Sequence, residues 1–454
     1  MKMPPPDLRT HLKPGGAGVL RAHDAVIEFG ALAAGNPLSV APESLEGAHV
    51  LLRTRSQFAA ALALIALDGI AGRIVIAPPD LADDHLEDVI RRARIDTLVT
   101  DGDAVGGLRL VAISRDLQSG ARAPASRASE WVMFTSGTTG APKMVAHTLE
   151  ALTGAIKATN EAATWGTFYD IRRYGGLQIF LRAVLGHASL ILSDAEEPIA
   201  DFLRRLGRDG VTHLTGTPSH WRQALMSPAI DHIAPRYVRL SGEIADRAVL
   251  DSLKERFPGA AIGHAYASTE AGVGFEVTDG LEGFPAFFVG GSGPVEMRIV
   301  DGSLQIRSPR AASGYVEGHA DLDGCVREGG AFTQDGFVDT GDMVELREGR
   351  YYFAGRRGGV INVGGLKIHP EEVEAVINRH PGVRLSRVSG RRNPITGAIV
   401  VAEVVLADGG DRDTIRNEIL RECRASLRPF QVPAMVRVVP GLALSAGGKL
   451  MRHA

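Results

Sequence analysis

Residues 134–143 carry the strongest chemical signal in the sequence, because a short apolar run leads there into hydroxyls and glycines and ends at a lysine. Glycines let several backbone amides turn toward one point, which creates a concavity suited to an anion. The hydroxyls add donors and the lysine adds a positive charge. The spacing is not that of a Walker A loop, and no Ser or Thr follows the lysine. The segment therefore predicts a polyphosphate-binding loop, made of Thr135, Ser136, Gly137, Thr138, Thr139, Gly140 and Lys143.

Lysine is rare in this chain, so its positions are informative. Only seven of the 50 basic residues are lysines. A codon preference for arginine is sufficient to explain the bias in general. Three lysines, Lys143, Lys367 and Lys449, nevertheless stand in Gly-rich stretches, where a retained lysine deserves inspection.

Two further motifs place carboxylates where a nucleotide could use them. The first reads Tyr-Ala-Ser-Thr-Glu over 266–270, and Glu270 suits a Mg²⁺ site because this ion prefers carboxylate and phosphate oxygens. The second reads Asp-Thr-Gly-Asp over 339–342, and Arg356 follows fourteen residues later. A carboxylate at a tight turn, here Asp342, can accept hydrogen bonds from both ribose hydroxyls, with Arg356 behind it. The Leu-Ser-Gly-Glu-Ile segment over 240–244 is a weaker signal.

In this order and roughly this spacing, the motifs resemble those of the acyl-adenylate-forming superfamily, which includes acyl-CoA synthetases, adenylation domains of nonribosomal peptide synthesis, and luciferases. The resemblance extends from about residue 50 to the C-terminus. It implies that Tyr266 stacks on adenine, Thr269 contacts phosphate and Glu270 helps to hold Mg²⁺. Ala267 departs from the pattern, which usually has Gly there. The implied ATP-binding residues are Thr135, Ser136, Gly137, Thr138, Thr139, Gly140, Lys143, Gly242, Glu243, Tyr266, Ser268, Thr269, Asp342 and Arg356; the implied catalytic residues are Thr138, Glu270 and Lys449.

Two C-terminal segments resemble the moving parts of the same superfamily. Residues 355–370 resemble its hinge and the loop that forms the thioester surface, with Gly364, Gly365 and Lys367 on the thiol side. Gly358 stands at the hinge position, which usually holds Asp or Lys. Lys367 either contacts the thiol substrate or is solvated. Lys449, in a Gly-Gly-Lys tail, resembles the lysine that bridges the carboxylate substrate and the α-phosphate. The resemblance implies a small domain that presents Lys449 first and the 363–370 loop after a rotation.

The acid pocket is predicted from an aromatic cluster over 165–174. Its four rings either pack in the core or line a flat slot. Gly176 matches a family Gly, which puts Arg173 where amino-acid-activating relatives carry an Asp, and a positive side chain would repel an ammonium group. We therefore expect an aromatic acid rather than an amino acid or a long-chain fatty acid. The predicted pocket residues are Phe168, Arg173, Tyr174, Gly242 and Ala267.

The elements that must position these residues alternate between helices and strands. Helices are expected near 55–68, 84–94, 197–208 and 219–226, with strands near 73–77, 96–100, 190–192, 211–214 and 237–241. This alternation predicts a layered α/β fold. Short β runs dominate from about 287, and a compact α+β unit follows the Gly-rich boundary. We expect a large N-terminal domain over 1–355, with a β-rich subdomain, a hinge near 356–359, and a small mobile α+β domain over 359–454. Residues 1–45 are expected to be irregular, with one strand near 25–29.

The composition narrows the function classes. The chain has 454 residues and a net charge of −3, which suits neither a dedicated nucleic-acid binder nor a polybasic membrane anchor. The longest apolar stretch, 58–71, is interrupted by Asp68 and is too short to span a bilayer. The N-terminus lacks the apolar region of a secretory signal, and the two cysteines form no CxxC pair, so we expect a cytoplasmic protein. The oligomeric state stays open, with a homodimer among the alternatives.

The predicted reaction is the ATP-dependent ligation of a small carboxylic acid to a thiol through an acyl-adenylate, with ATP, Mg²⁺ and coenzyme A (CoA) as cofactor and co-substrates. One alternative is an adenylating enzyme that loads the acid onto the pantetheine of an acyl carrier protein. A second alternative is a degenerate nucleotide-binding regulatory protein. Ala267, Arg173 and Gly358, which depart from the family pattern, keep this alternative open. The intact Lys449 and Glu270 argue against the regulatory-protein alternative.

Overall fold

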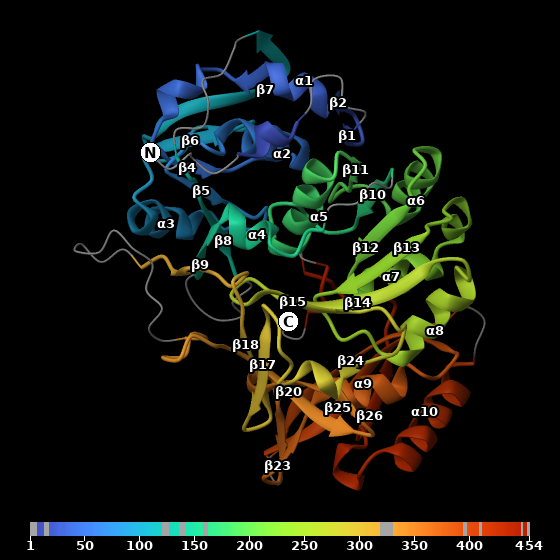
Figure 1. The fold of residues 1–454 in the computed structure, drawn as a ribbon. Coiled ribbons are helices and arrows are strands. Elements are labelled where there is room, and N and C mark those ends of the chain that lie inside the picture. Colours follow the sequence, from blue (N-terminus) through green and yellow to red (C-terminus); the bar gives the residue numbers. More distant parts are fainter. Residues whose placement is uncertain are drawn as a thin grey trace.

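The computed structural model describes residues 7–12, 18–119, 127–135, 142–157, 162–317, 330–393, 397–407, 411–445 and 448–451. It has a large body of several α/β layers and a smaller C-terminal unit beside it (Figure 1). The predicted α/β fold class is confirmed. Among the described residues, no helix is both long enough and apolar enough to cross a membrane.

One eight-stranded sheet contains the strand that leads into the predicted phosphate loop. Its order is β19-β9-β8-β5-β4-β6-β7-β3, and β5, β4 and β6 run parallel with β8. The strands are β3 (Gly35–Leu38), β4 (His49–Leu52), β5 (Arg73–Ile76), β6 (Thr97–Thr100), β7 (Arg109–Ser119), β8 (Glu130–Phe134), β9 (Met144–Thr148) and β19 (Gly314–Tyr315).

A second eight-stranded sheet carries most of the other motifs. Its order is β15-β14-β13-β12-β10-β11-β1-β2, and the strands from β14 to β1 are parallel. The strands are β1 (Val19–Arg21), β2 (Val26–Glu28), β10 (Thr164–Thr167), β11 (Ser189–Leu192), β12 (His213–Gly216), β13 (Tyr237–Ser241), β14 (Ala261–Ser268) and β15 (Gly272–Val277). Their parallel direction brings the carboxyl ends of β10, β12, β13 and β14 to one edge of the sheet.

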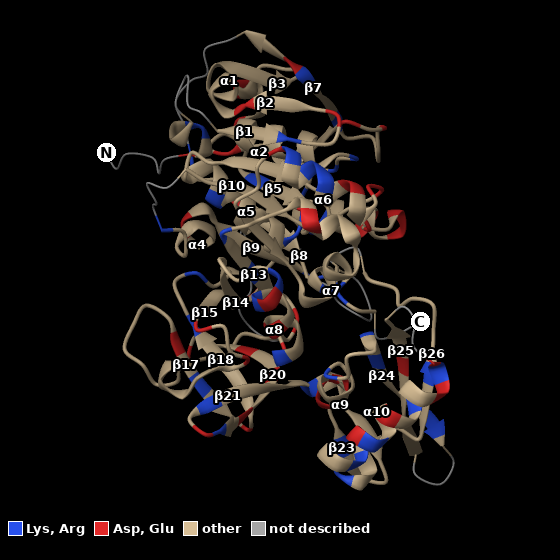
Figure 2. Cartoon of the chain, turned by 90° about the vertical axis from the view of Figure 1, so that its right-hand side faces the viewer, with Lys and Arg blue, Asp and Glu red and all other residues tan. Residues whose placement is uncertain are grey.

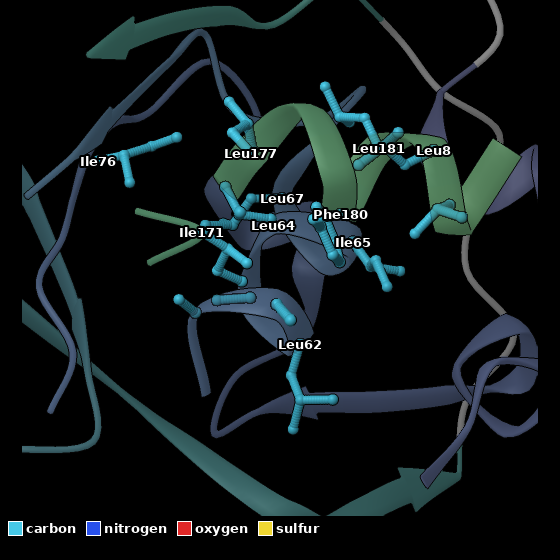
Figure 3. Close-up of a cluster of buried hydrophobic side chains, with 14 of the residues drawn as sticks. Leu8, Leu62, Leu64, Ile65, Leu67, Ile76, Ile171, Leu177, Phe180 and Leu181 are labelled. Atoms are coloured by element: carbon cyan, nitrogen blue, oxygen red, sulfur yellow. The ribbon is translucent and has the colours of Figure 1, made fainter. Parts of the chain in front are cut away.

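Two helices join these sheets through one core. All eleven residues of α2 (Gln57–Leu67) are buried, and its N-terminus is capped by Ser56, whose hydroxyl accepts a hydrogen bond from the Phe58 amide at 3.0 Å. α2 and α5 (Tyr174–Leu185) meet in one cluster that also takes side chains from both sheets (Figure 3). The remaining helices of the large body are α1 (Phe29–Ala34), α3 (Leu86–Ala93), α4 (Leu149–Thr153), α6 (Ile199–Arg208), α7 (Pro218–Met226) and α8 (Arg247–Arg256).

A five-stranded sheet links the large body to the C-terminal unit. Its order is β16-β21-β20-β18-β17, with β16 (Phe284–Pro285), β17 (Glu296–Val300), β18 (Ser303–Arg307), β20 (Val338–Arg347) and β21 (Arg350–Arg356). The small unit then begins with the hairpin β22 (Ile361–Val363) and β23 (Leu366–Ile368). It continues with α9 (Pro370–Ile377), β24 (Val383–Asn393), β25 (Gly397–Leu406), α10 (Arg412–Ser426) and β26 (Met435–Val438), and its β24-β25-β26 sheet carries basic positions along its strands (Figure 2).

The strand expected near 25–29 is β2, but the expectation that the rest of residues 1–45 is irregular was wrong. Residues 18–38 contain the strands β1, β2 and β3 and the helix α1. β1 is held by distant pairing, since Leu20 stands opposite Leu190 of β11. Tertiary pairing overrides the weak local preference of this Gly- and Ala-rich segment.

Candidate active site

The candidate site lies where parallel strands of the second sheet end. β12 ends at Gly216, β13 at Ser241 and β14 at Ser268, and each is followed directly by a motif or a helix start. Ligands of open α/β sheets bind beyond the carboxyl ends of the strands, so this edge is the expected place for a nucleotide. The predicted residues Gly242, Glu243, Ser268, Thr269 and Glu270 therefore lie along one edge.

The two ends of the predicted phosphate loop meet. The Thr135 amide donates to the Lys143 carbonyl oxygen at 3.1 Å, and Phe134 pairs with Met144 across β8 and β9. The Lys143 ammonium lies 5.5 Å from the centre of the Tyr315 ring. Ser136, Gly137, Thr138, Thr139 and Gly140 lie outside the described residues, and their roles stay predictions.

Tyr315 also connects this lysine to the predicted metal ligand. Its hydroxyl donates to Glu270 Oε1 at 3.4 Å, and the Ala312 amide donates to the Glu270 carbonyl oxygen at 2.9 Å. Burial and the Glu270 charge raise the pKa of Tyr315 to about 12, so the hydroxyl remains a donor at neutral pH. Glu270 therefore lies on the same side of the site as Lys143.

Glu270 has the chemistry that Mg²⁺ needs at such a site. Mg²⁺ usually takes one or two carboxylates together with substrate phosphates rather than a full set of protein ligands. In the described part of the chain, no three His, Cys, Asp or Glu side chains gather into a metal site. A single carboxylate beside the phosphate loop fits an ion that arrives with ATP, and Glu270 would supply that oxygen.

The predicted ribose ligands form one hydrogen-bonded group. Asp342 and Arg356 are paired across β20 and β21, and Arg356 Nε donates to Asp342 Oδ1 at 3.0 Å. The Tyr266 hydroxyl donates to Asp342 Oδ2 at 2.6 Å. Burial and the neighbouring carboxylate hold the pKa of Tyr266 well above its usual value, so it stays protonated. An ionised carboxylate has about four acceptor positions, so Asp342 retains capacity for two ribose hydroxyls.

The Tyr266 ring has aromatic neighbours that the sequence did not indicate. Phe275 and Phe353 lie nearly parallel to it, with ring centres 5.5 and 5.4 Å away. They fix the plane of the ring. Tyr266 itself is half-buried, and its contact with adenine stays a prediction.

Lys449 reaches this group from the far end of the chain. A Cβ added to Gly242 would lie 3.3 Å from Lys449 Cε, so the lysine side chain crosses the backbone at the end of β13. Protein atoms around its ammonium group lower its pKa, and Arg356 lowers it further, while Glu243 and Asp342 act in the opposite direction. The residue as a whole is nevertheless exposed to solvent.

The lowered pKa of Lys449 predicts a pH dependence. The charged form should support adenylation, so kcat/KM for ATP in acyl-AMP formation should fall as pH rises through the lowered pKa. Lys449→Arg keeps a positive charge at all accessible pH values. We expect its alkaline limb to move to higher pH than that of the wild type, measured by acid-dependent pyrophosphate exchange. Identical alkaline limbs would exclude Lys449 as the titrating group.

The aromatic residues of the predicted pocket divide into two pairs. Phe168 stacks on His220 at the start of α7, with ring centres 5.4 Å apart, and the Tyr169 hydroxyl donates to the Ser241 carbonyl oxygen at the end of β13 at 2.8 Å. Trp165 and Tyr174 are buried in the core cluster around α5. Tyr169 is also buried, and Phe168 packs edge-on against Phe202 and Trp221, so core packing is observed for these rings and the slot stays a prediction.

Two other predicted pocket residues lie at the margins of this edge. Arg173 precedes α5 and pairs with Asp80, and it lies close enough for its charge to act on Lys449. Ala267 is half-buried against the core cluster. The acid pocket as a whole stays a prediction.

The predicted hinge and thiol residues lie in the small unit. Gly358 belongs to a short turn, Arg357–Gly359, in which Arg357 pairs with Asp339 at 3.1 Å. Gly364 and Gly365 have φ values of 59° and 88°, which the tight turn between β22 and β23 requires. Lys367 is exposed, and β23 lies at the end of the small unit away from β14 and β15 (Figure 1).

The sequence analysis missed Thr217 and His220, which lie at the start of α7. The Thr217 hydroxyl accepts from the His220 amide at 3.0 Å, and the imidazole Nδ1 accepts from the Thr217 amide at 3.2 Å. This reciprocal cap is visible in the sequence as Thr-Pro-Ser-His, a helix-start pattern. Nothing local in that pattern indicates a place in the site.

Comparisons with known proteins show which family the chain resembles. The family model for the AMP-binding enzyme matches residues 44–316, and that for the AMP-binding enzyme C-terminal domain matches residues 372–449. The 2-succinylbenzoate–CoA ligase of Listeria innocua is 28% identical over 340 residues, which cover 71% of this chain and 68% of that protein. The long-chain-fatty-acid–CoA ligase of Bacillus subtilis is 26% identical over 352 residues, which cover 71% and 60%.

A solved structure agrees over nearly the whole chain. A variant of E. coli MenE with bound OSB-AMS superposes with a TM-score of 0.76 at 23% identity, and the match covers 94% of this chain and 93% of that one. This likeness concerns the fold. The first family model spans more than half of the chain. The chain belongs to the family of AMP-binding enzymes, the acyl-adenylate-forming superfamily that its motifs resemble.

Proposed function

We propose that this enzyme activates an aromatic carboxylic acid as an acyl-adenylate and then transfers the acyl group to CoA. In the first step the carboxylate attacks the α-phosphate of ATP and pyrophosphate leaves. In the second step the thiol attacks the acyl carbon and AMP leaves. The first step brings two anions together, so it requires positioned positive charge and hydrogen-bond donors. Mg²⁺ bound with ATP would supply part of that charge.

The observation that carries the proposal is the meeting of Lys449 with the nucleotide residues. Its side chain lies over Gly242, and the charges of Asp342 and Arg356 both act on it. A ribose held by Asp342 would leave the α-phosphate on the side toward Lys449. This is the position from which one ammonium group can neutralise both the carboxylate and the α-phosphate.

The charges around Lys449 support an acid without an ammonium group. Lys449 would attract a carboxylate and repel an ammonium group, and Arg173, although paired with Asp80, acts on Lys449 with a charge of the same sign. Phe168 is half-buried beside His220 at the start of α7, and a substrate ring that reached it would gain offset or edge-on contact. The 2-succinylbenzoate ligase among the relatives acts on an aromatic acid.

A groove in the small unit supports CoA as the thiol. It has a volume of 990 Å³, adjoins Asn362 and Gly365 of the β22–β23 hairpin, and is lined by four arginines, which are Arg387, Arg391, Arg392 and Arg437. Arginine binds phosphate through paired hydrogen bonds. CoA carries three phosphates, whereas the pantetheine of a carrier protein carries one phosphodiester. The groove therefore favours CoA over the carrier-protein alternative.

The test is a substrate screen. We expect acid-dependent pyrophosphate release with benzoates or cinnamates, and kcat/KM at least about tenfold higher for the best aromatic acid than for any C6–C16 fatty acid or amino acid. An apolar contact difference of about 1.4 kcal/mol is sufficient for that ratio. Highest efficiency with a C12 or longer acid, or with an amino acid, would contradict the aromatic assignment while leaving the ligase assignment in place.

The same screen distinguishes the acceptors. With CoA, we expect acyl-CoA and AMP in equal amounts. With CoA withheld and an acyl carrier protein supplied, the enzyme should stop after one equivalent of acyl-AMP. A preference for the carrier protein would establish the loading alternative. We also propose a cytoplasmic location, since a buried free thiol such as Cys423 suits a reducing compartment.

A further inference from the structure

The backbone on both sides of Lys449 is held by the large domain. The Thr217 hydroxyl donates to the Gly448 carbonyl oxygen at 2.7 Å, and the Leu450 amide donates to Glu243 Oε1 at 2.8 Å. The second oxygen of Glu243 accepts from the Ser219 amide at 2.9 Å, at the start of α7. The two peptide groups that flank the catalytic lysine are therefore bound before any substrate is considered.

His220 forms the surface on which this backbone rests. A Cβ added to Gly448 would lie 1.7 Å from His220 Cε1 and 2.1 Å from Nε2, so only glycine fits there. Gly448 also has a φ of 70°, which strongly favours glycine. The imidazole is fixed by the reciprocal cap with Thr217 and by stacking on Phe168. Burial lowers the pKa of His220 to about 4, so the ring is neutral at pH 7 and does not repel Lys449.

The tail itself is shaped for this contact. The Ser445 amide donates to the Lys449 carbonyl oxygen at 2.7 Å, and the Gly448 amide donates to the Ser445 carbonyl oxygen at 2.8 Å. A β-bridge joins Leu444 and Leu450. Residues 444–445 and 448–450, which these contacts join, are called the Lys449 turn below.

We propose that Thr217, His220 and Glu243 form a docking site for this turn, and that they are positioning residues that hold Lys449 in place for adenylation and release it before the CoA step. The proposal rests on the proposed function. It gives Glu243 a different role from the ATP contact that the sequence motif implies, because both carboxylate oxygens already accept backbone amides, one of them from the tail. None of the three residues is proposed to contact the reacting atoms. They act by fixing the backbone around Lys449.

The first test replaces Gly448 with Ala. The new methyl group would strike the His220 ring, so the turn cannot dock, although Lys449 and every nucleotide residue remain. We expect kcat for acyl-AMP formation to fall about 10²-fold, as when a positioned catalytic charge is lost. KM for ATP and the melting temperature should be unchanged, and thioester formation from synthetic acyl-AMP and CoA should proceed at the wild-type rate. Gly441→Ala is the matched control, since a Cβ there meets nothing within 4 Å, and it should leave both half-reactions unchanged.

The second test changes the large-domain side. Glu243→Gln retains one acceptor but must lose one of the two amide hydrogen bonds, so kcat for adenylation should fall about tenfold at unchanged KM for ATP. His220→Ala combined with Gly448→Ala should recover part of the lost adenylation, because the ring that the methyl group strikes is gone. A rise in KM for ATP without a change in kcat in Glu243→Gln would identify an ATP ligand and overturn the docking role.

Other outcomes are equally decisive. Wild-type adenylation by Gly448→Ala, or an equal loss in both half-reactions, would overturn the proposal. If the wild type shows no acid-dependent pyrophosphate exchange, the proposed function fails, and the docking site is then judged by hydrogen exchange. In that measurement the Leu450 amide should be protected in the wild type and exchange faster in Glu243→Gln. Equal exchange in the two proteins would reject the docking site independently of activity.

Discussion

Replacing Lys449 with Ala is expected to slow acyl-AMP formation about 10²–10³-fold, which is the usual cost of removing one positioned charge from a site where charge develops. Thioester formation from pre-made acyl-AMP should continue at the wild-type rate. The reason is geometric, since Lys449 lies over Gly242 beside the nucleotide residues, whereas the thiol-side hairpin lies elsewhere in the small unit. The measurement is each half-reaction separately, by pyrophosphate exchange and by thioester release.

Lys254→Ala is the matched control for this variant. Lys254 lies on α8 and pairs with Asp251 of the same helix at 3.5 Å, so its removal takes away one lysine without changing the site. Its adenylation rate should equal that of the wild type. Acyl-AMP formation at the wild-type rate by Lys449→Ala would show that another group neutralises the α-phosphate.

The two lysine-tail variants separate charge from position. Lys449→Ala removes the ammonium group. Gly448→Ala keeps the ammonium group but prevents the backbone beside it from packing against the His220 ring. If both variants slow adenylation to a similar degree, the ammonium group accelerates the reaction only when its position is fixed, as expected for preorganised electrostatic catalysis. If the turn leaves for the CoA step, as proposed, its contacts should be few. Two backbone hydrogen bonds with Thr217 and Glu243, together with packing on the His220 ring, fit that proposal.

Local patterns were sufficient to predict part of this structure. The helix expected near 55–68 is α2, because an apolar run preceded by a Ser cap is a strong local signal. Asp342 and Arg356 were grouped as ribose ligands with the help of the family resemblance, and an antiparallel hairpin places them opposite each other. Short-range order of this kind is encoded within a few residues of where it appears.

Contacts between distant segments could not be predicted in the same way. Tyr266 and Asp342 are 76 residues apart, and Leu450 and Glu243 are 207 residues apart. Such pairs depend on how sheets and domains pack, and the hydrophobic periodicity of the sequence does not predict that packing. The family resemblance supplied the role of Lys449, but neither it nor the spacing indicated Thr217 and His220. The strands β1 and β3 were missed for the same reason, since they exist by pairing with β11 and β7.

Replacing Asp342 with Ala is expected to raise KM for ATP about 10- to 100-fold. A hydrogen bond to a charged group contributes about 1.5–3 kcal/mol, and each 1.4 kcal/mol is a factor of ten in affinity. The variant loses the acceptor for ribose and also leaves the Tyr266 hydroxyl and Arg356 without their carboxylate. Glu345→Ala is the matched control, because Glu345 lies on the same strand and pairs with Arg347 at the surface, so ATP binding should be unchanged.

The ribose assignment is tested most sharply with ATP analogues. If Asp342 accepts the ribose hydroxyls, 2′-deoxy-ATP and 3′-deoxy-ATP should bind the wild type more weakly than ATP, measured calorimetrically. In Asp342→Ala the three nucleotides should bind equally, because the group that distinguishes them is gone. The coupling between the two changes isolates this contact from any general loosening of the β20–β21 hairpin. Unchanged ATP affinity in the variant, or the same penalty for the deoxy analogues in both proteins, would place the ribose away from Asp342.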